Sequence, residues 1–342
     1  MAVLAALAWA GLSASFATTP VAIATACEFD GVDRVVAVGD VHGAYDRFVE
    51  ILKTAGIIDN ADHWSGGKTH LVQLGDVLDR GPDSRKALDL LQRLEKEANS
   101  AGGQVHSLIG NHEVMRLLGD MRYVTPGEYA AFETKDSKDT LKQVVEAATQ
   151  DAEARKKLMA ETPLGQIEMM RAFAANGPYG SYIRRLNAVV RINGVLFLHG
   201  GISPDVAPQS CTKIDDTVRK DLSSDLEKTK AEPLKTLTAR EDGPLWYRGL
   251  MQEPDTFEPE VDKILAAQHA TAIVVAHTVV AGGRIGVRFG GKVIGIDTGM
   301  QQAYIPDGRA SALEIRGGVF TAIYTDKREV IAGGRLPAGR RP

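Results

Sequence analysis

Short apolar stretches that end in a glycine and a polar side chain recur in the first third of the chain. Residues 34–40, 70–76 and 105–111 each begin with a β-rich apolar run and end in Gly-Asp or Gly-Asn. Between them, residues 45–55 and 84–98 have the hydrophobic spacing of helices. This β-α-β-α-β order predicts parallel strands joined by helices. In such a sheet ligands bind at the carboxyl ends of the strands, which is where the polar side chains fall.

A helical region follows these strands. Residues 116–180 contain no strand-like run, whereas residues 141–159 and 164–175 have helical periodicity with mixed charges on their polar faces. We interpret residues 116–180 as a helical insertion that caps the sheet rather than as a separate domain.

Strands resume in the second half of the chain. Residues 186–192 and 195–199 flank Asn193-Gly194, a dipeptide typical of a two-residue β-hairpin turn. A second charged helical stretch covers residues 214–240. The remaining expected strands, separated by glycine turns, are 272–277, 287–289, 292–297, 312–315, 320–324 and 329–331. The pattern predicts an α/β fold in which two facing, mixed β-sheets are flanked by helices and carry a helical cap.

The first 26 residues contain no charged side chain. They are mostly apolar and end in Ala24-Thr25-Ala26, which is similar to the A-x-A cleavage site of an export signal. The basic segment that usually opens such a signal is missing, because the first basic residue is Arg34. We interpret residues 1–26 as a signal peptide and expect a periplasmic or secreted protein. A start codon placed after a basic segment would explain the missing residues, and so would an uncleaved single-helix membrane anchor, which is the alternative to a signal peptide.

The two cysteines, Cys27 and Cys211, are too few for a disulfide framework and match no common zinc-binding spacing. Cys27 directly follows the candidate cleavage site, which is also where a lipoprotein carries its lipid. Ala24, however, stands where lipoprotein signals usually have Leu. The alternative is a disulfide between Cys27 and Cys211 in an oxidising compartment, which agrees with export.

Composition excludes several classes of protein. The chain has 40 Lys and Arg against 44 Asp and Glu, a net charge of −4, which argues against nucleic-acid binding through bulk charge. With 44% hydrophobic and 25% charged residues, it resembles a soluble globular protein rather than a disordered or multi-span membrane protein. We expect one domain over residues 30–333, a flexible tail over 334–342, and a monomer.

Five motifs at predicted strand ends contain the oxygen and imidazole groups that divalent metal ions favour. Two neighbouring ions need one carboxylate that bridges them. Asp40 and His42 lie two residues apart and can approach one ion together, whereas Asp76 is the natural bridge. The side chains of Asn111, His199 and His277 complete the coordination of the second ion. In chain order the motifs are Gly39-Asp40-Val41-His42-Gly43, Gly75-Asp76-Val77-Leu78-Asp79-Arg80-Gly81, Gly110-Asn111-His112-Glu113, His199-Gly200-Gly201 and Ala276-His277-Thr278.

In this order and spacing the motifs resemble those of the calcineurin-like metallophosphoesterase superfamily and, within it, of the phosphoprotein phosphatase family. The resemblance extends over residues 35–299 and implies a metallophosphoesterase sandwich of two sheets. It assigns His112 as the general acid, Asp79 as the residue that orients it, and Arg80 as a phosphate clamp. It also assigns the six metal ligands, with Asp40 and His42 on one ion, Asp76 between the ions, and Asn111, His199 and His277 on the other.

The segment Pro244-Leu245-Trp246-Tyr247-Arg248 and Asp297-Thr298-Gly299 resemble the Shewanella-like branch of bacterial-type phosphatases. This resemblance makes Arg248 a second phosphate-binding arginine, so that Arg80, Arg248 and Asn111 form the expected substrate-binding set. A Trp-Tyr-Arg run can also be simple packing. We expect Glu113 to orient the loop or a neighbouring histidine, and Asp297 to be a turn residue or a partner of a ligand rather than a ligand.

The resemblance implies phosphate monoester hydrolysis by in-line attack of a hydroxide that bridges two divalent ions. The ligand set leaves manganese, iron and zinc open as these ions. The expected substrate is a phosphorylated protein or peptide, with phosphotyrosine and phosphoserine or phosphothreonine both open. The alternatives are a symmetrical dinucleoside tetraphosphatase or other small-molecule phosphoesterase, and a non-catalytic module that binds phosphorylated ligands. We expect no nucleic-acid partner, and membrane contact only through an N-terminal anchor.

Overall fold

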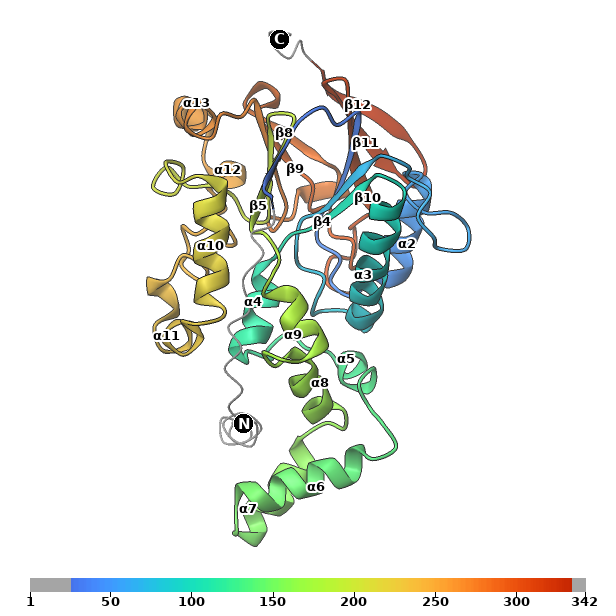
Figure 1. Ribbon diagram of the computed structural model, residues 1–342, viewed down its shortest axis with the longest axis vertical. Coiled ribbons are helices and arrows are strands. Elements are labelled where there is room, and N and C mark those ends of the chain that lie inside the picture. The colour runs from blue at the N-terminus through green and yellow to red at the C-terminus, as the bar shows by residue number, and fades with distance from the viewer. Residues whose placement is uncertain (1–25, 334–342) are drawn as a thin grey trace.

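Two six-stranded β-sheets face each other, with helices on their outer sides (Figure 1). The computed structural model describes residues 26–333. Residues 1–25 of the predicted signal peptide and the tail 334–342 lie outside the described residues. Only Ala26, the last residue of the predicted cleavage motif, is described. The sheets and their flanking helices confirm the predicted α/β sandwich.

The first sheet is built around the three predicted N-terminal strands. They pair in parallel and are joined by α2 (Tyr45–Thr54) and α3 (Ser84–Ser100). Three antiparallel C-terminal strands extend the sheet from β2. In spatial order the strands are β12 (Arg328–Gly333), β11 (Val319–Tyr324), β10 (Ser311–Arg316), β2 (Arg34–Val38), β3 (His70–Gln73) and β4 (Gln104–Ser107).

The second sheet contains the predicted hairpin. Asn193 and Gly194 join its two strands with φ values of 49° and 76°, which is the left-handed backbone that a tight hairpin turn requires. In spatial order the strands are β1 (Glu28–Phe29), β5 (Val189–Ile192), β6 (Val195–Leu198), β7 (Ala272–Val275), β9 (Val293–Gly295) and β8 (Gly286–Arg288). Strand β1, which the sequence pattern did not indicate, begins before residue 30 and pairs in parallel with β5.

The central strands are buried on both faces. In β2, Val35 and Ala37 lie in an apolar core between the two sheets, whereas Val36 and Val38 belong to the core under the helices. Strands covered on both faces need apolar side chains at every position, which explains the continuous apolar runs in the sequence.

Helices occupy the interval between β4 and β5. The single helix expected over residues 141–159 is wrong, because α6 (Ser137–Ala148) ends at Ala148 and α7 (Ala152–Glu161) begins at Ala152. Asp151 caps the second helix by accepting a hydrogen bond from the Ala154 amide at 2.6 Å. Helices α6 and α7 extend away from the sheets (Figure 1). The helices of this interval are α4 (Asn111–Leu118), α5 (Pro126–Ala130), α6 (Ser137–Ala148), α7 (Ala152–Glu161), α8 (Gln166–Phe173) and α9 (Pro178–Ile183).

Further helices cover the outer side of the second sheet (Figure 1). The helical stretch expected at 214–240 is divided into α10, α11 and the 3-10 turn η1. Within residues 26–333, no helix has both the length and the apolar character needed to cross a membrane. The remaining helices and turns are α10 (Cys211–Asp221), α11 (Leu226–Ala231), η1 (Pro233–Lys235), α12 (Gly249–Gln252), η2 (Asp255–Phe257), α13 (Glu258–Ala267), η3 (Ala281–Gly283) and η4 (Phe289–Gly291).

A disulfide joins Cys27 to Cys211, with the two Cα atoms 6.2 Å apart. It connects the residue before β1 to the first residue of α10. Of the two interpretations of Cys27, the structure therefore has the disulfide, and a sulfur engaged in a disulfide is not available for a lipid.

Candidate active site

The predicted site residues gather at the carboxyl ends of strands from both sheets. These strands belong to two sets of parallel neighbours, β2-β3-β4 and β6-β7-β9, so their carboxyl ends lie at one edge of each sheet. Except for Asp79 and His199, the predicted residues line one cavity of about 130 Å³. The predicted residues that line it are Asp40, His42, Asp76, Arg80, Asn111, His112, Arg248 and His277.

Backbone strain is concentrated in these loops. Positive φ values are rare for residues other than glycine and cluster at functional sites. Gly75, with φ of 88°, lies so close to the neighbouring loop that an added Cβ would be 2.5 Å from the Gly110 nitrogen. The loops after β3 and β4 therefore touch through their backbones. The site residues with positive φ are His42 (49°), Asp76 (54°), Asp79 (69°), Arg80 (66°) and His277 (61°).

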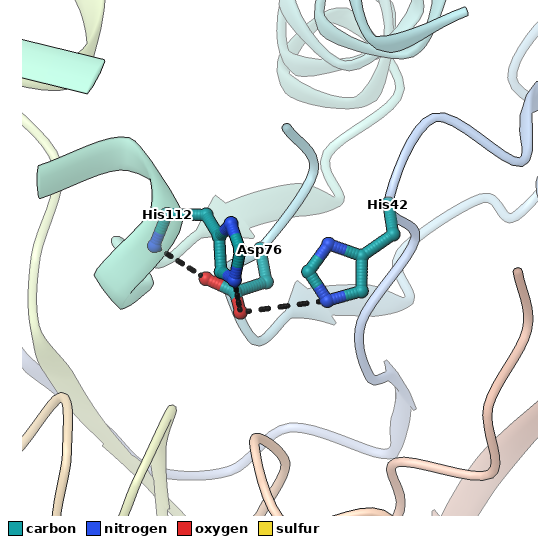
Figure 2. A group of neighbouring side chains, drawn as sticks. All are labelled: His42, Asp76 and His112. Atoms are coloured by element: carbon teal, nitrogen blue, oxygen red, sulfur yellow. Dashed lines mark hydrogen bonds and ion pairs between the residues drawn. The ribbon is translucent and has the colours of Figure 1, made fainter. Parts of the chain in front are cut away.

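Asp76 is at the centre of the cluster. Its Oδ2 lies 3.3 Å from Nε2 of His199, 3.7 Å from Nε2 of His42 and 3.9 Å from Nε2 of His112. Its Oδ1 accepts the backbone N–H of His112 at 2.9 Å, as Figure 2 shows together with the contacts to His42 and His112. Two groups that could each hold a metal ion share Asp76. They are His42, Asp76 and His112, and Asp76, His199 and His277.

Asp40 and Asn111 extend the cluster on its two sides. Oδ2 of Asp40 lies 3.7 Å from Nε2 of His42, and its Oδ1 accepts the backbone N–H of His277 at 3.2 Å. Oδ1 of Asn111 lies 2.9 Å from Nε2 of His199. The structure thus brings all six predicted ligands together, with Asp76 between the two predicted sets.

Hydrogen bonds to backbone carbonyls fix the ring orientation of two histidines and turn Nε2 toward the carboxylates. Nδ1 of His42 lies 2.8 Å from the Leu78 carbonyl, and Nδ1 of His199 lies 2.7 Å from the Leu74 carbonyl. A carbonyl only accepts hydrogen bonds, so Nδ1 carries the proton in both rings, and Nε2 of neutral His42 keeps its lone pair, as in metal-binding histidines. Nε2 of His277 is buried and has no hydrogen-bond partner among residues 26–333. This orphaned atom and the two oriented rings fit a metal centre.

The charges of the cluster also favour a cation. Burial lowers the pKa of His42 to about 4 and that of His277 to about 2, so both rings are neutral and can act as ligands. Burial, Asp297 and Asp76 raise the pKa of Asp40 well above its usual value. For Asp76, burial opposes ionisation, but His199 and His112 hold its pKa well below the usual value. Crowded, buried carboxylates of this kind are stabilised by divalent cations.

His112 has a carboxylate partner on the side away from Asp76. Its Nδ1 lies 2.7 Å from Oδ2 of Asp79. Burial alone would lower the pKa of His112, but Asp76 and Asp79 raise it. The geometry gives His112 a hydrogen bond that orients its ring and an Nε2 atom in the group around Asp76, as its predicted role as proton donor requires.

Two arginines reach the same cavity. The guanidinium carbon of Arg80 lies near two aromatic rings, 4.4 Å from the centroid of Tyr123 and 3.7 Å from that of Tyr304. Nη1 of Arg248 donates to the His277 carbonyl at 2.8 Å and to Oγ1 of Thr278 at 3.3 Å. Both arginines therefore place positive charge beside the cluster of candidate metal ligands around Asp76.

Glu113 holds the loop after β3. Its Oε2 accepts the backbone N–H groups of Gly110 and Asp76, each at 2.8 Å, and its Oε1 accepts those of Val77 at 2.9 Å and Leu78 at 3.2 Å. The expectation that Glu113 orients the loop is confirmed.

Sequence reasoning missed several residues of the site. Arg116 follows His112 by one helical turn in α4, and that spacing could have indicated a shared helix face. Thr125 and Glu128 form a capping box at α5, which has a recognisable sequence pattern. The positions of Tyr123 and Tyr304 had no signal in the sequence.

Comparison with known proteins agrees with this geometry. The calcineurin-like phosphoesterase family matches residues 33–281. Shewanella-like protein phosphatase 2 of Arabidopsis thaliana is 30% identical over 316 residues, which cover 87% of this chain and 78% of that protein. Shewanella-like protein phosphatase 1 of Plasmodium berghei is 28% identical over 274 residues, covering 78% of this chain and 67% of that protein.

A solved structure is similar over nearly the same extent. The cold-active protein tyrosine phosphatase of a psychrophilic Shewanella species superimposes with a TM-score of 0.70 and 30% sequence identity, over 90% of this chain and 82% of that chain. The order of the motifs, the position of Asp76 in both candidate metal groups, the sequence relatives and the solved structure lead to the same assignment. The chain belongs to the calcineurin-like phosphoesterase family of metal-dependent phosphoesterases.

Proposed function

We propose that this chain is a protein phosphatase that hydrolyses phosphate monoesters on phosphorylated proteins or peptides. The observation that carries the proposal is one cavity in which Arg80, Arg248 and His112 surround the Asp76 cluster. A phosphate group needs this combination: cationic groups for its oxygens and a proton donor for the leaving oxygen. The similarity to Shewanella-like protein phosphatases and to a protein tyrosine phosphatase supports a protein substrate.

In this proposal the protein holds two divalent cations. Asp40, His42 and Asp76 would bind one, and Asp76, Asn111, His199 and His277 would bind the other. When bound, such ions would neutralise phosphate charge and lower the pKa of water, so that hydroxide would be available as the nucleophile near neutral pH. Manganese, iron and zinc all accept this ligand set, so metal analysis of the natively purified protein decides between them.

The remaining residues position the phosphate and the leaving group. Arg80 and Arg248 bind the non-bridging phosphate oxygens, where charge-assisted hydrogen bonds are strong and directional. As water oxygen bonds to phosphorus in line, the ester P–O bond breaks and its electron pair stays on the leaving oxygen. Nε2 of His112 gives that oxygen a proton and later regains one from solvent. Asn111, which lies 2.9 Å from His199 and lines the cavity, would contribute to substrate binding through its amide.

A substrate panel tests the proposal. Purified protein with added Mn²⁺ is assayed on 4-nitrophenyl phosphate, a phosphotyrosine peptide, a phosphoserine peptide and diadenosine tetraphosphate. Turnover of either peptide with a kcat/KM above that for the dinucleotide supports a protein phosphatase. Turnover of the dinucleotide alone would make the chain a nucleotide hydrolase, and no turnover of any ester would leave only phospholigand binding.

We also propose that the protein is exported to the periplasm or secreted and acts as a monomer. The disulfide between Cys27 and Cys211 supports an oxidising compartment. Mass spectrometry of the mature protein tests the proposal directly. A mature N-terminus close to residue 27 supports cleavage, whereas an intact residue 1 in a membrane fraction supports an anchor.

A further inference from the structure

A row of buried charged side chains leads from the active site into the helical insertion. It starts at His112, continues through Asp79 and Arg116, and ends at Glu128 in α5. Nδ1 of His112 lies 2.7 Å from Oδ2 of Asp79, Nη2 of Arg116 donates to Oδ1 of Asp79 at 2.5 Å, and the same Nη2 donates to Oε1 of Glu128 at 3.1 Å. None of these four side chains is more than 4% exposed.

Stability does not explain why Asp79, Arg116 and Glu128 are buried together. Removing an arginine and two carboxylates from water costs free energy that their attraction only partly restores, and apolar side chains of similar volume often serve stability as well or better. Arg116 and Glu128 do not line the active-site cavity. Their contact with the site runs through Asp79.

Arg116 and Glu128 hold both the side chain and the backbone of Asp79. The two carboxylate oxygens of Asp79 are divided between His112 and Arg116. Oε1 of Glu128 also accepts the backbone N–H of Asp79 at 3.2 Å. Asp79 has φ of 69°, a conformation that persists only where the surroundings fix it.

The outer end of the row is itself fixed. Oε2 of Glu128 accepts the backbone N–H of Thr125 at 3.1 Å within the capping box of α5. The guanidinium carbon of Arg116 lies 5.0 Å from the ring centroid of Phe173 in α8, and its Nη1 lies 3.2 Å from the Met169 sulfur. The insertion therefore provides a rigid support for Asp79.

We infer that Arg116 and Glu128 are positioning residues that act through Asp79 to direct the proton on Nε2 of His112 toward the leaving oxygen. This inference rests on the proposed phosphatase function. A ring held at Nδ1 by a fixed carboxylate keeps Nε2 within reach of the ester, whereas a mobile Asp79 leaves the ring free to rotate. A misplaced proton donor costs most where the leaving oxygen is most basic.

The test compares leaving groups. Arg116→Met removes the guanidinium hydrogen-bond donors but keeps an unbranched side chain. Arg116→Lys keeps the positive charge on a single amine but loses the forked guanidinium. Each variant is assayed on aryl phosphates of increasing leaving-group pKa and on an alkyl phosphate such as phosphoserine. For Arg116→Met we expect kcat to fall less than about threefold for 4-nitrophenyl phosphate and on the order of tenfold or more for the alkyl ester, with KM nearly unchanged. Arg116→Lys and Glu128→Gln should lie between this variant and the wild type.

A double-mutant cycle tests whether the effect passes through the histidine. In a His112→Asn background, Arg116→Met should produce little further loss of kcat, because the proton donor that it positions is already absent. Arg34→Met is the matched control. Arg34 forms an ion pair with Glu314 at 2.5 Å, with side chains 13% and 15% exposed, at the opposite end of β2. Its loss should leave the leaving-group dependence unchanged.

Several outcomes would overturn the inference. Equal losses of kcat for aryl and alkyl esters, additive losses in the His112→Asn background, or a fall in bound metal that accounts for the lost activity would each make Arg116 merely structural. If Arg116→Met does not fold, Arg116→Lys and Glu128→Gln decide by the same comparison. A wild-type protein that hydrolyses no monoester contradicts the proposed function instead, so the two failures are distinguishable.

Discussion

The guanidinium carbon of Arg80 lies 3.7 Å from the ring centroid of Tyr304, so the aromatic ring covers one face of the predicted phosphate clamp. The ring centroid of Tyr123 lies 4.4 Å from the same carbon, and the Tyr123 carbonyl accepts the Arg80 backbone N–H at 2.9 Å. Both rings are only partly buried, at 38% and 42% exposure for Tyr123 and Tyr304. Arg80 and both tyrosines line the active-site cavity, so the rings contact the guanidinium beside the space that a phosphate would enter.

Tyr304→Leu should weaken phosphate binding. A cation–π contact at an exposed site contributes about 0.5–1 kcal/mol, which corresponds to a rise of roughly two- to fivefold in KM for 4-nitrophenyl phosphate and in Ki for inorganic phosphate. Tyr304→Phe keeps the ring and should behave as the wild type. An unchanged KM in the leucine variant, with metal content also unchanged, would show that the ring does not help to hold Arg80.

Asp76→Asn should abolish activity and remove at least one metal ion per chain. The substitution removes the negative charge from the oxygen that faces His42, His112 and His199. Metal content is measured by elemental analysis and activity with 4-nitrophenyl phosphate. Asp83→Asn is a suitable control, because Asp83 pairs with Lys86 outside the cavity. A variant at position 76 that retains two metal ions and full activity would contradict the site assignment.

The residues that the structure brings together around Asp76 could be picked out from the sequence because each belongs to a local pattern. Each predicted ligand lies within four residues of the end of a strand, as Asp40 does after the buried, apolar run Val35 to Val38. Such runs are recognisable without knowledge of the tertiary structure, and parallel pairing then brings their ends together.

Features that depend on distant partners could not be predicted in this way. Strand β1 has two residues and no periodicity, and it is held by pairing with β5 and by the disulfide of Cys27. Tyr304 meets Arg80 only through the tertiary fold. The helix break at Asp151 reflects a local side-chain cap within a stretch whose composition favours a helix on both sides.

Arg248→Ala should raise KM and lower kcat. Nη1 of Arg248 bonds to the carbonyl of His277, so the substitution removes both a phosphate ligand and a contact that fixes a predicted metal ligand. Charge-assisted hydrogen bonds contribute about 1.5–3 kcal/mol, which gives a loss of roughly 10- to 100-fold in kcat/KM. Arg248→Lys should restore part of it. An unchanged kcat/KM in the alanine variant would mean that the Trp-Tyr-Arg run serves packing alone.

Asp215→Asn should flatten the pH dependence of stability. Oδ1 of Asp215 accepts the N–H groups of Ala188 and Val189, whereas its Oδ2 is buried without a hydrogen-bond partner among residues 26–333. Burial raises the pKa of this carboxyl to about 7. Because the folded-state pKa is above the unfolded value, folding is favoured at low pH, and this contribution is lost as the pH rises from about 4 to 7.

The measurement is urea unfolding of both proteins between pH 5 and pH 8. Asp215→Asn keeps the accepting oxygen and carries no charge, so its stability relative to the wild type should increase across this range by up to about 3 kcal/mol. The exposed Asp255, which pairs with Arg288 and does not act on Asp215, supplies the control variant Asp255→Asn. A difference between wild type and Asp215→Asn that does not change with pH would mean that Asp215 is ionised throughout.

Reduction of the disulfide should lower the melting temperature without lowering activity. Cys27 and Cys211 lie 184 residues apart in the sequence, and neither lines the active-site cavity. Closing so long a loop restricts the unfolded chain and typically adds about 2–4 kcal/mol of stability. Tris(2-carboxyethyl)phosphine should therefore lower the melting temperature of the wild type by several degrees. The double variant Cys27→Ser and Cys211→Ser should melt at the lower temperature with or without the reductant. A wild-type melting temperature that does not respond to the reductant would contradict a stabilising disulfide, and a parallel loss of kcat would connect β1 to the active site.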